Sequence, residues 1–199
     1  AASDVYKRQI HHMDEGIEEG ETVRVITAAG EFIGVGHYQI GSIAVRVLSF
    51  EDIEINTDFW CERLQSALDV RIGVGIADSP TNNTYRLVHG EGDYLPGLVI
   101  DCYGSTAVMQ AHSVGMHVCR NEICQALVQV MGDRIANVYY KSETTLPYKA
   151  DLHQENGFLV GGDASNVAME NGLKFHIDWL RGQKTGFFVD QRENRSLLE

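Results

Sequence analysis

The sequence predicts an α+β protein in which a small β module precedes a larger α+β domain. Short strand patterns occupy both halves of the chain, and only two long segments carry a helical stripe of apolar residues. In the second half, one helix separates a run of three strands from a fourth strand. That order favours a mixed α+β layer over a doubly wound parallel sheet.

The first module is predicted from three strand patterns separated by glycines. The alternation that a half-buried strand requires occurs at Val23, Val25, Ile43, Val45 and Val47. Turns or bulges are indicated by Gly30, Gly34, Gly36 and Gly41. We therefore expect strands over residues 22–26, 31–38 and 42–50.

A helix is predicted over residues 56–70, with Asn56 or Thr57 as its N-cap. Its apolar stripe consists of Trp60, Leu64, Ala67 and Leu68. We expect this helix to act as a linker that closes the first module, which then occupies residues 13–72.

The larger domain is predicted over residues 73–181, after a polar boundary at 71–83. A helix is expected over 114–131, and the segment 152–172 is rich in loops with one hairpin. The dipeptide Asn171-Gly172 predicts a tight turn into an alternating strand, 173–179. The remaining strands are expected over residues 84–90, 98–104, 105–112 and 135–141.

Composition indicates a soluble globular protein without a membrane span. The chain has 199 residues, of which 44% are hydrophobic and 22% charged. It contains no apolar run near the roughly 20 residues that cross a bilayer. The net charge of −12 argues against non-specific binding of nucleic acid over the whole surface. We expect a cytoplasmic protein.

The start of the chain and its cysteines carry no further signal. Residues 1–12 lack Met and any apolar stretch, so we expect a non-native or disordered leader there, and a fragment edge rather than a signal peptide. The four cysteines lack metal-ligand spacing, so we expect reduced, mostly buried thiols and no metal site. They are Cys61, Cys102, Cys119 and Cys124.

A first motif, RLVHGEGDYLPGLVIDCYG at residues 86–104, predicts two turns between apolar strands and is called the hairpin motif below. A structural hairpin is its simpler interpretation. A catalytic role for Glu91 or Asp93 needs a partner base or a metal that the sequence does not reveal.

A second motif, GQKTGFFVDQRENR at residues 182–195, gathers polar groups around a short apolar plug and is called the KTGFF segment below. Asp190 is placed to N-cap a helix that carries arginines, and arginines beside a helix N-terminus suit an anionic group. As a pattern alone, a solvated amphipathic helix is the favoured interpretation.

Together the two motifs resemble the RlmI-type family of S-adenosylmethionine-dependent 23S rRNA methyltransferases, which make 5-methylcytosine. The hairpin motif matches the family pattern at Arg86, Leu87, Glu91, Asp93, Leu95, Pro96, Gly97 and Asp101. The KTGFF segment matches at Lys184, Thr185, Gly186, Asp190, Gln191, Arg192 and Arg195. The resemblance covers nearly all of the chain from about residue 13.

The resemblance implies three parts. Residues 13–72 would hold a PUA-like RNA-binding module lacking its first strand, and 73–181 the central α+β domain. Residues 182–199 would be the first turn or two of a Rossmann-like methyltransferase domain. The chain would thus be an N-terminal fragment, inactive by itself, with its cysteine nucleophile beyond residue 199 and the Gly-rich loop for the cofactor absent.

The resemblance also implies roles for the KTGFF segment. Residues near the methionine end of S-adenosylmethionine or the flipped base would be Phe188, Asp190, Gln191, Arg192 and Asn194. Lys184 and Thr185 would order the loop or touch RNA phosphate. The expected partner is 23S rRNA, with no membrane and no metal.

Two other hypotheses stay open at this point. A stand-alone RNA-binding module would explain the missing cofactor cradle, although the acidic composition speaks against it. A protein–protein scaffold is the third hypothesis. The sequence leaves open the modified nucleotide, the choice of cytosine and the oligomeric state, with a homodimer among the options.

Overall fold

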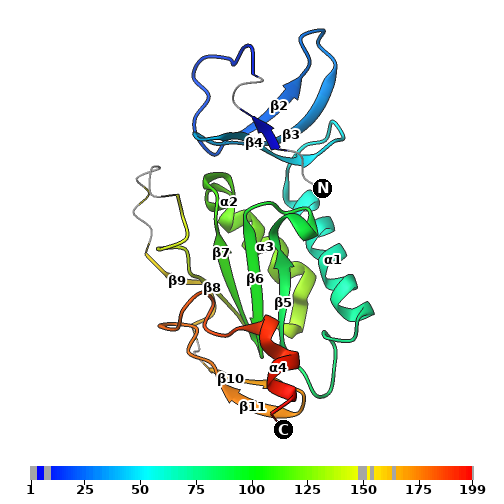
Figure 1. The fold of residues 1–199 in the computed structure, drawn as a ribbon, viewed down its shortest axis with the longest axis vertical. Helices are drawn as coiled ribbons and strands as arrows, with labels where there is room; N and C mark the ends of the chain where they lie inside the picture. The colour runs from blue at the N-terminus through cyan, green and yellow to red at the C-terminus, as the bar shows by residue number, and fades with distance from the viewer. Residues whose placement is uncertain (1–3, 7–9, 148–151, 153–154, 163–164, 199) are drawn as a thin grey trace.

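The computed structural model describes residues 4–6, 10–147, 152, 155–162 and 165–198. A small sheet lies at one end of the molecule and a larger α/β layer below it, as Figure 1 shows. The predicted α+β organisation, a β module followed by an α+β domain, is confirmed.

The first module is an antiparallel sheet of four strands in the order β1-β4-β3-β2. Three of its strands fall where the strand patterns predict them: β2 (Thr22–Ile26), β3 (Phe32–Tyr38) and β4 (Ile43–Ser49). Within the predicted non-native or disordered leader, residues 1–12, the structure describes only 4–6 and 10–12, and there β1 (Asp4–Tyr6) pairs with β4 as an edge strand. A strand of three residues has too few positions for alternation to reveal it.

Helix α1 (Thr57–Gly73) confirms the helix predicted over residues 56–70 and extends it by three residues. Of the two N-cap candidates the structure selects Asn56, whose side-chain oxygen accepts a hydrogen bond from the Phe59 N–H at 3.1 Å. The predicted stripe is buried, and it packs in one core with the larger sheet and α3. We therefore propose that α1 belongs to the larger domain and that the boundary falls near residue 56.

The larger sheet has five strands in sequence order. Its neighbours are antiparallel except for β7 and β8, which run parallel. The strands are β5 (Thr84–His89), β6 (Leu98–Tyr103), β7 (Thr106–Ala111), β8 (Asn137–Tyr140) and β9 (Gly157–Val160). The chain crosses from β7 to β8 through helices, as a parallel pair requires.

The crossover consists of α2 (Val114–Val118) and α3 (Arg120–Met131), where the sequence predicts one helix. Ser113 caps α2, and Cys119 interrupts the helical run between the two. Short 3-10 helices follow β5, α3 and Phe188: η2 (Gly90–Asp93), η3 (Gly132–Arg134) and η5 (Val189–Gln191).

The two faces of the larger sheet are covered differently. One face packs on α1 and α3 and forms the main core, with Trp60, Leu64 and Met109 fully buried. The other face carries a second, aromatic cluster built on Tyr103, Tyr139 and Trp179. The chain after β9 runs across this second face (Figure 1).

A separate hairpin, β10 (Val167–Glu170) and β11 (Leu173–His176), confirms the turn predicted at Asn171-Gly172. Both turn residues have positive φ, at 50° and 83°, as a type I′ turn requires. The predicted strand 173–179 ends earlier, at His176, because Ile177 and Trp179 leave the hairpin and bury themselves against the sheet.

The first module and the larger domain meet at β3 and α2. His37 is 1% exposed and lies against Gly115, where an added Cβ would come within 2.2 Å of the imidazole ring. The ring also lies 6.1 Å from that of Trp60, between centroids. No helix among the described residues has the length and apolar character to span a membrane.

Candidate functional site

The two motifs meet at one buried carboxylate, through residues that are 84 positions apart in sequence. Asp101 on β6 is 0% exposed and accepts a hydrogen bond from the Thr185 hydroxyl at 2.5 Å. Arg86 on β5 donates to both oxygens of Asp101, at 2.8 and 2.9 Å. The hairpin motif therefore forms the foundation on which the KTGFF segment rests.

The Arg86–Asp101 pair is strong because it is bidentate and largely removed from water. The hydrogen bond with Asp101 raises the pKa of the Arg86 guanidinium. The side chain of Arg86 keeps 29% of its surface exposed, so one edge of the guanidinium still faces solvent. The adjacent Asp190 of the KTGFF segment acts on the same guanidinium through its charge.

Thr185 is fully buried, and its hydroxyl lies between Asp101 and the Tyr103 hydroxyl, 2.9 Å from the latter. Burial raises the pKa of Tyr103, so the phenol remains protonated and donates a hydrogen bond to the Phe187 carbonyl at 3.3 Å. Of the two roles expected for Thr185, this geometry favours ordering the loop over contact with RNA.

Two glycines let the KTGFF segment fold tightly on the chain that precedes it. At Gly182 a Cβ would lie 2.3 Å from the Asp178 carbonyl, and at Gly186 (φ 106°) it would lie 2.5 Å from the Trp179 Cα. Lys141 at the end of β8 donates to the carbonyls of Trp179 and Gly182, at 2.7 and 2.6 Å. The loop is therefore held on both sides.

A second buried carboxylate, Glu170 on β10, fastens the far end of the segment. It is 2% exposed and accepts two hydrogen bonds from Arg195, at 2.7 and 2.8 Å. Arg192 lies 3.6 Å from the same carboxylate and donates to the Asn82 side chain at 2.9 Å. The short helix α4 (Arg192–Ser196) is thus clamped to β10.

These contacts divide the predicted site residues into two groups. Arg192 belongs to the buried, anchoring group. Its guanidinium donates hydrogen bonds to Asn82 and Thr84 and lies beside Glu170, and this geometry lends no support to a contact with the cofactor. The exposed group comprises Lys184, Phe188, Asp190, Gln191 and Asn194.

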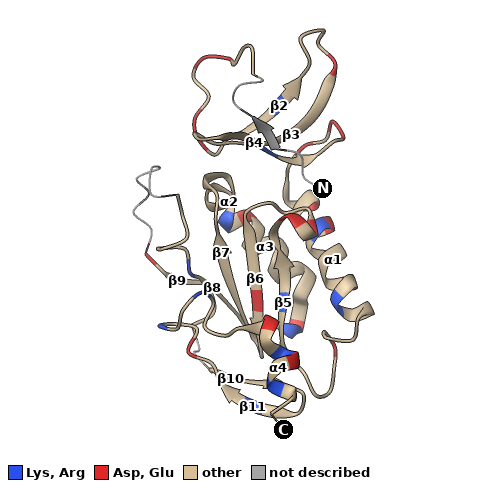
Figure 2. Ribbon diagram, viewed as in Figure 1, with Lys and Arg blue, Asp and Glu red and all other residues tan. Residues whose placement is uncertain are grey.

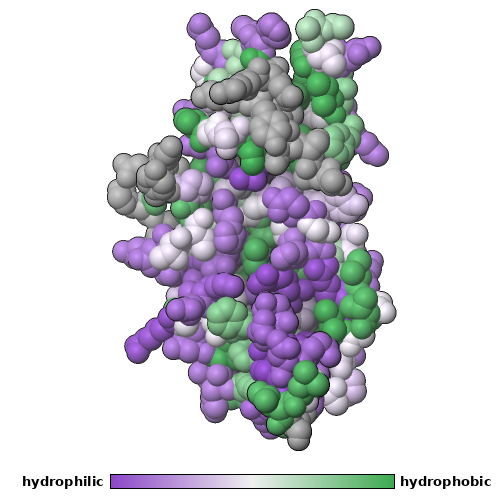
Figure 3. Space-filling view, viewed as in Figure 1, coloured by the Kyte–Doolittle hydropathy of each residue, from purple (hydrophilic) through white to green (hydrophobic). Residues whose placement is uncertain are grey.

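The exposed group is a polar row of Asp190, Gln191 and Asn194 along η5 and the start of α4, preceded in the chain by the pair Lys184 and Phe188. The Asn194 amide donates to Gln191 at 2.6 Å, and Gln191 contacts Asp190 at 3.4 Å. The Lys184 ammonium lies 4.8 Å from the centroid of the Phe188 ring. Both signs of charge occur on α4 (Figure 2), and the surrounding face is largely hydrophilic (Figure 3). The exposed group offers hydrogen-bonding groups and one exposed aromatic ring on a fixed base.

The contacts of the acidic turn in the hairpin motif favour its simpler interpretation, a structural hairpin. Asp93 forms a bidentate pair with Arg71, whose Nη2 lies 2.7 Å from its Oδ2, and both side chains are about a tenth exposed. The backbone N–H of His89 donates to the same carboxylate at 2.6 Å. Glu91 faces solvent and lies 3.8 Å from Arg46 of the first module.

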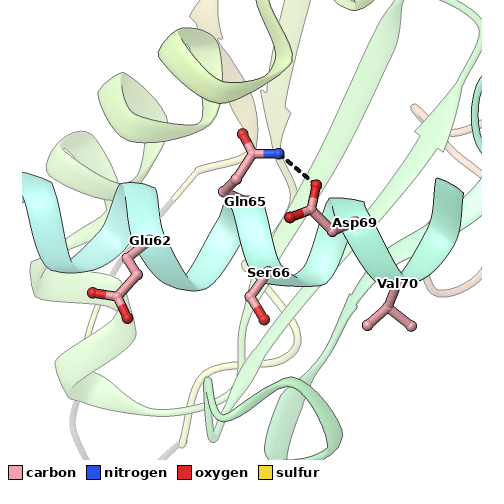
Figure 4. A pocket seen from close by; sticks show the side chains of 5 residues that line it. All are labelled: Glu62, Gln65, Ser66, Asp69 and Val70. Atoms are coloured by element: carbon pink, nitrogen blue, oxygen red, sulfur yellow. Dashed lines mark hydrogen bonds between the residues drawn. The ribbon is translucent and has the colours of Figure 1, made fainter. Parts of the chain in front are cut away.

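A depression of about 560 Å³ lies elsewhere, on the outer side of α1. Its lining residues all come from this one helix: Glu62, Gln65, Ser66, Asp69 and Val70. Figure 4 shows these side chains diverging rather than converging on a point, with Gln65 hydrogen-bonded to Asp69 at 2.8 Å. We therefore do not assign it a ligand. The described residues contain no cluster of three potential metal ligands.

Sequence patterns did not identify Glu170 or Lys141, which hold the segment. Glu170 lies in the stretch predicted as loop-rich, and Lys141 closes an otherwise apolar strand. One signal in the sequence could have pointed to a buried carboxylate. Arg192 and Arg195 match a family motif, and an arginine that is buried needs a carboxylate partner.

Comparison with known proteins gives a domain match and a set of relatives. Residues 5–50 match a family model for the PUA-like domain. The chain is 35% identical over 195 residues to ribosomal RNA large subunit methyltransferase I of Aliivibrio fischeri, covering 96% of this chain and 48% of the relative. The protein of the same name from Vibrio parahaemolyticus is 37% identical over 194 residues, with the same coverage.

Solved structures of similar fold extend this result. The chain matches "A putative sam-dependent methyltransferase from Streptococcus mutans" with a TM-score of 0.77 and 24% identity, over 98% of this chain and 49% of that one. A second methyltransferase structure, complexed with SAH, gives a TM-score of 0.79 at 23% identity, with 99% and 49% covered. The chain therefore spans about half the length of the curated relatives it matches. The resemblance predicted from the two motifs is confirmed over nearly the whole chain.

Proposed function

We propose that this chain is one part of an S-adenosylmethionine-dependent methyltransferase that modifies cytosine C5 in 23S rRNA. The similarity to curated large-subunit rRNA methyltransferases over 96% of the chain carries this proposal. The PUA-like match at residues 5–50 and the methyltransferase fold of the structural neighbours support it. The working protein would act on RNA in the cytoplasm.

Within this function, the KTGFF segment would form one edge of the cofactor site. Its exposed amides and carboxylate suit the hydroxyl and amino groups of S-adenosylmethionine, and the Phe188 ring offers a surface for stacking. Bound S-adenosylmethionine supplies the methyl group from its sulfonium. Asn194, Gln191 and Asp190 would orient the cofactor, while Thr185, Arg192 and Arg195 keep their backbone in place.

The cysteine chemistry of C5 methylation would come from outside these residues. A thiolate must add to the cytosine ring, which requires a thiol that ionises readily. Burial instead raises the pKa of Cys102 to about 12, and the pKa values of Cys119 and Cys124 to about 11. Burial also raises the pKa of Cys61, with a further contribution from the Asp58 charge. None of the four suits the nucleophile.

The test uses the longer protein that contains this chain. We expect it to transfer labelled methyl from S-adenosylmethionine to unmodified 23S rRNA and to yield 5-methylcytidine, identified by mass spectrometry of the nucleosides. A different methylated nucleoside would overturn the choice of cytosine C5 alone, and an absence of labelled RNA would overturn the methyltransferase. By calorimetry, the 199 residues alone should bind the cofactor negligibly; micromolar binding would contradict their description as one part of the site.

A pair of neighbours on α4 tests the assigned edge. Asn194→Ala should raise the KM for S-adenosylmethionine about tenfold, because an amide contact is lost, without lowering the temperature of unfolding. Glu193→Ala is the matched control, since Glu193 is equally exposed on the same turn. Equal KM values for the two variants would remove Asn194 from the cofactor site.

A further inference from the structure

Tyr94 is an exposed aromatic residue that the proposed cofactor edge does not use. It follows η2 in the turn between β5 and β6, and 58% of its surface is exposed. Its backbone is left-handed, with φ 59° and ψ 24°. Glycine or asparagine suits that conformation, whereas a bulky side chain there is uncommon and costs stability. Such outliers persist where the surrounding structure holds them, often at functional positions.

The residues on both sides of Tyr94 are firmly anchored. Asp93 is paired with Arg71, and Leu95 is 0% exposed in the main core. The Tyr94 N–H also donates to the Glu91 carbonyl at 3.3 Å. The ring therefore projects from a rigid turn, and little conformational entropy would be lost when a ligand stacks on it.

An arginine without a carboxylate partner covers one side of this ring. The Arg63 guanidinium on α1 lies 5.7 Å from the centroid of Tyr94 and 5.2 Å from that of the buried Phe59. Within the part of the chain that the structure describes, no carboxylate pairs with Arg63, and its buried Nε has no hydrogen-bond partner. A guanidinium close to two aromatic rings and without a carboxylate partner suits an anion beside an aromatic group, which it would bind through its terminal nitrogens rather than the buried Nε.

We propose that Tyr94 and Arg63 form a contact site for single-stranded RNA, in which a base stacks on the Tyr94 ring and the adjoining phosphate pairs with Arg63. The combination of an aromatic platform and a guanidinium is how proteins bind unpaired nucleotides without reading their sequence. The site rests on the proposed function, since it assumes that the substrate is RNA. It lies away from the KTGFF segment, beside the first module.

The position of the site fits an RNA strand that runs over the surface across the junction of the two parts of the molecule. The same turn carries Glu91, which lies 3.8 Å from Arg46 on β4 of the PUA-like module. The exposed Glu91 lies in the turn that precedes Tyr94, so the affinity of the site would come from stacking and one phosphate contact rather than from a broad positive surface. A shallow salt dependence is the expected consequence.

The experiment measures fluorescence anisotropy of a fluorescein-labelled single-stranded oligoribonucleotide titrated with the 199-residue chain. Tyr94→Gly should weaken binding about tenfold, because one base loses its stacking surface. The same change relieves the left-handed backbone, so the urea midpoint should stay equal or rise. Tyr94→Phe keeps the ring and should bind as the unchanged chain does. A purely structural ring would lower stability and binding together.

Arg63→Gln tests the phosphate contact. It should weaken binding and reduce the slope of log K against log salt by about 0.7, the value for one phosphate on a single strand. Arg134→Gln is the matched control, because Arg134 is exposed and paired with Asp78 on another surface, and its slope should not change.

Three outcomes would overturn the inference. The first is an unchanged RNA affinity of Tyr94→Gly, and the second is the absence of RNA binding by the unchanged chain. The third is a loss of self-association in Tyr94→Gly, measured by sedimentation, without a change in RNA affinity. That result would make the ring a protein contact. An assay of methyl transfer in the longer protein distinguishes a failure of this RNA-contact site from a failure of the proposed function. RNA methylation with unaffected Tyr94 binding removes only this site, whereas Tyr94-dependent binding without methylation removes only the proposed activity.

Discussion

The larger domain makes two junctions, and they are held by opposite kinds of chemistry. The buried part of its junction with the first module is neutral and depends on shape, with the His37 ring against Gly115. An ion pair at the same junction, Arg46–Glu91, involves a largely exposed carboxylate. Its junction with the KTGFF segment is ionic, with Asp101 and Glu170 almost fully buried beneath arginines. Both junctions fix a neighbouring part of the chain to the larger domain, the first at α2 and the second at β6 and β10.

The difference predicts how each junction fails. A buried charge that loses its partner is costly, so the ionic junction should respond sharply to the loss of one carboxylate. A neutral junction has no such charge, but a buried imidazole resists protonation and makes the junction sensitive to acid. Substitutions and pH therefore separate the two.

The largest effect is expected for Asp101→Asn. The amide keeps the size of the carboxylate but leaves Arg86 without its counter-charge, which should lower the free energy of unfolding by about 3 kcal/mol. Urea unfolding with an unchanged m-value measures it. Asp52→Asn is the control, because the Arg24–Asp52 pair is more than half exposed and should cost well under about 1 kcal/mol. Equal losses would mean that burial does not strengthen the Asp101 pair.

Glu170→Gln is the next largest change. Arg195 loses a charge-assisted pair and Arg192 a nearby counter-charge, so we expect a loss of about 2 kcal/mol. Because these contacts hold only α4 and η5, the loss should be local. Hydrogen exchange should accelerate over residues 188–198 and stay unchanged in the β6 and β7 strands. Faster exchange throughout the sheet would show that the hairpin and the segment unfold as one unit with the domain.

Acid should weaken the neutral junction through His37. Burial lowers the pKa of His37 to about 4, whereas an unfolded histidine has a pKa near 6.5. Above pH 6.5 the residue is neutral in both states and costs nothing. As the pH falls below 6.5, the unfolded state binds a proton first, so about 2 kcal/mol of stability is lost by pH 5.

His37→Gln isolates this contribution from the carboxylates that also titrate in acid. The variant should lose less free energy of unfolding between pH 7.5 and pH 5 than the unchanged chain. His12→Gln, at an exposed position, should reproduce the unchanged profile. Identical profiles for the His37 variant and the unchanged chain would show that the imidazole binds a proton as readily in the folded state as in the unfolded state.

The fold was predictable where a local pattern decides it. Alternation located β2 and β4, the cap candidates Asn56 and Thr57 located the start of α1, and Asn171-Gly172 located the hairpin turn. Each depends on residues adjacent in sequence. The edge strand β1 and the early end of β11 depend on pairing and burial against distant residues, which periodicity does not contain.

The candidate site divides along the same line. The motif match predicted site residues in the KTGFF segment, and the segment does present an exposed polar row. The pattern could not say which members face inward, because that depends on Asp101 and Glu170, far away in sequence. Thr185 and Arg192 therefore had to be predicted with the exposed residues, and only their buried partners distinguish them.

The smallest effect is expected for Thr185→Val, which tests whether the ionic junction depends on its hydroxyl or only on its charges. Valine fills the same volume but removes the hydrogen bond to Asp101, whose pairing with Arg86 remains. The loss should be about 1 kcal/mol, measured beside Thr22→Val, an exposed strand position where valine should cost nothing. A loss as large as that of Asp101→Asn would mean that the hydroxyl, and not the arginine, holds the carboxylate in place.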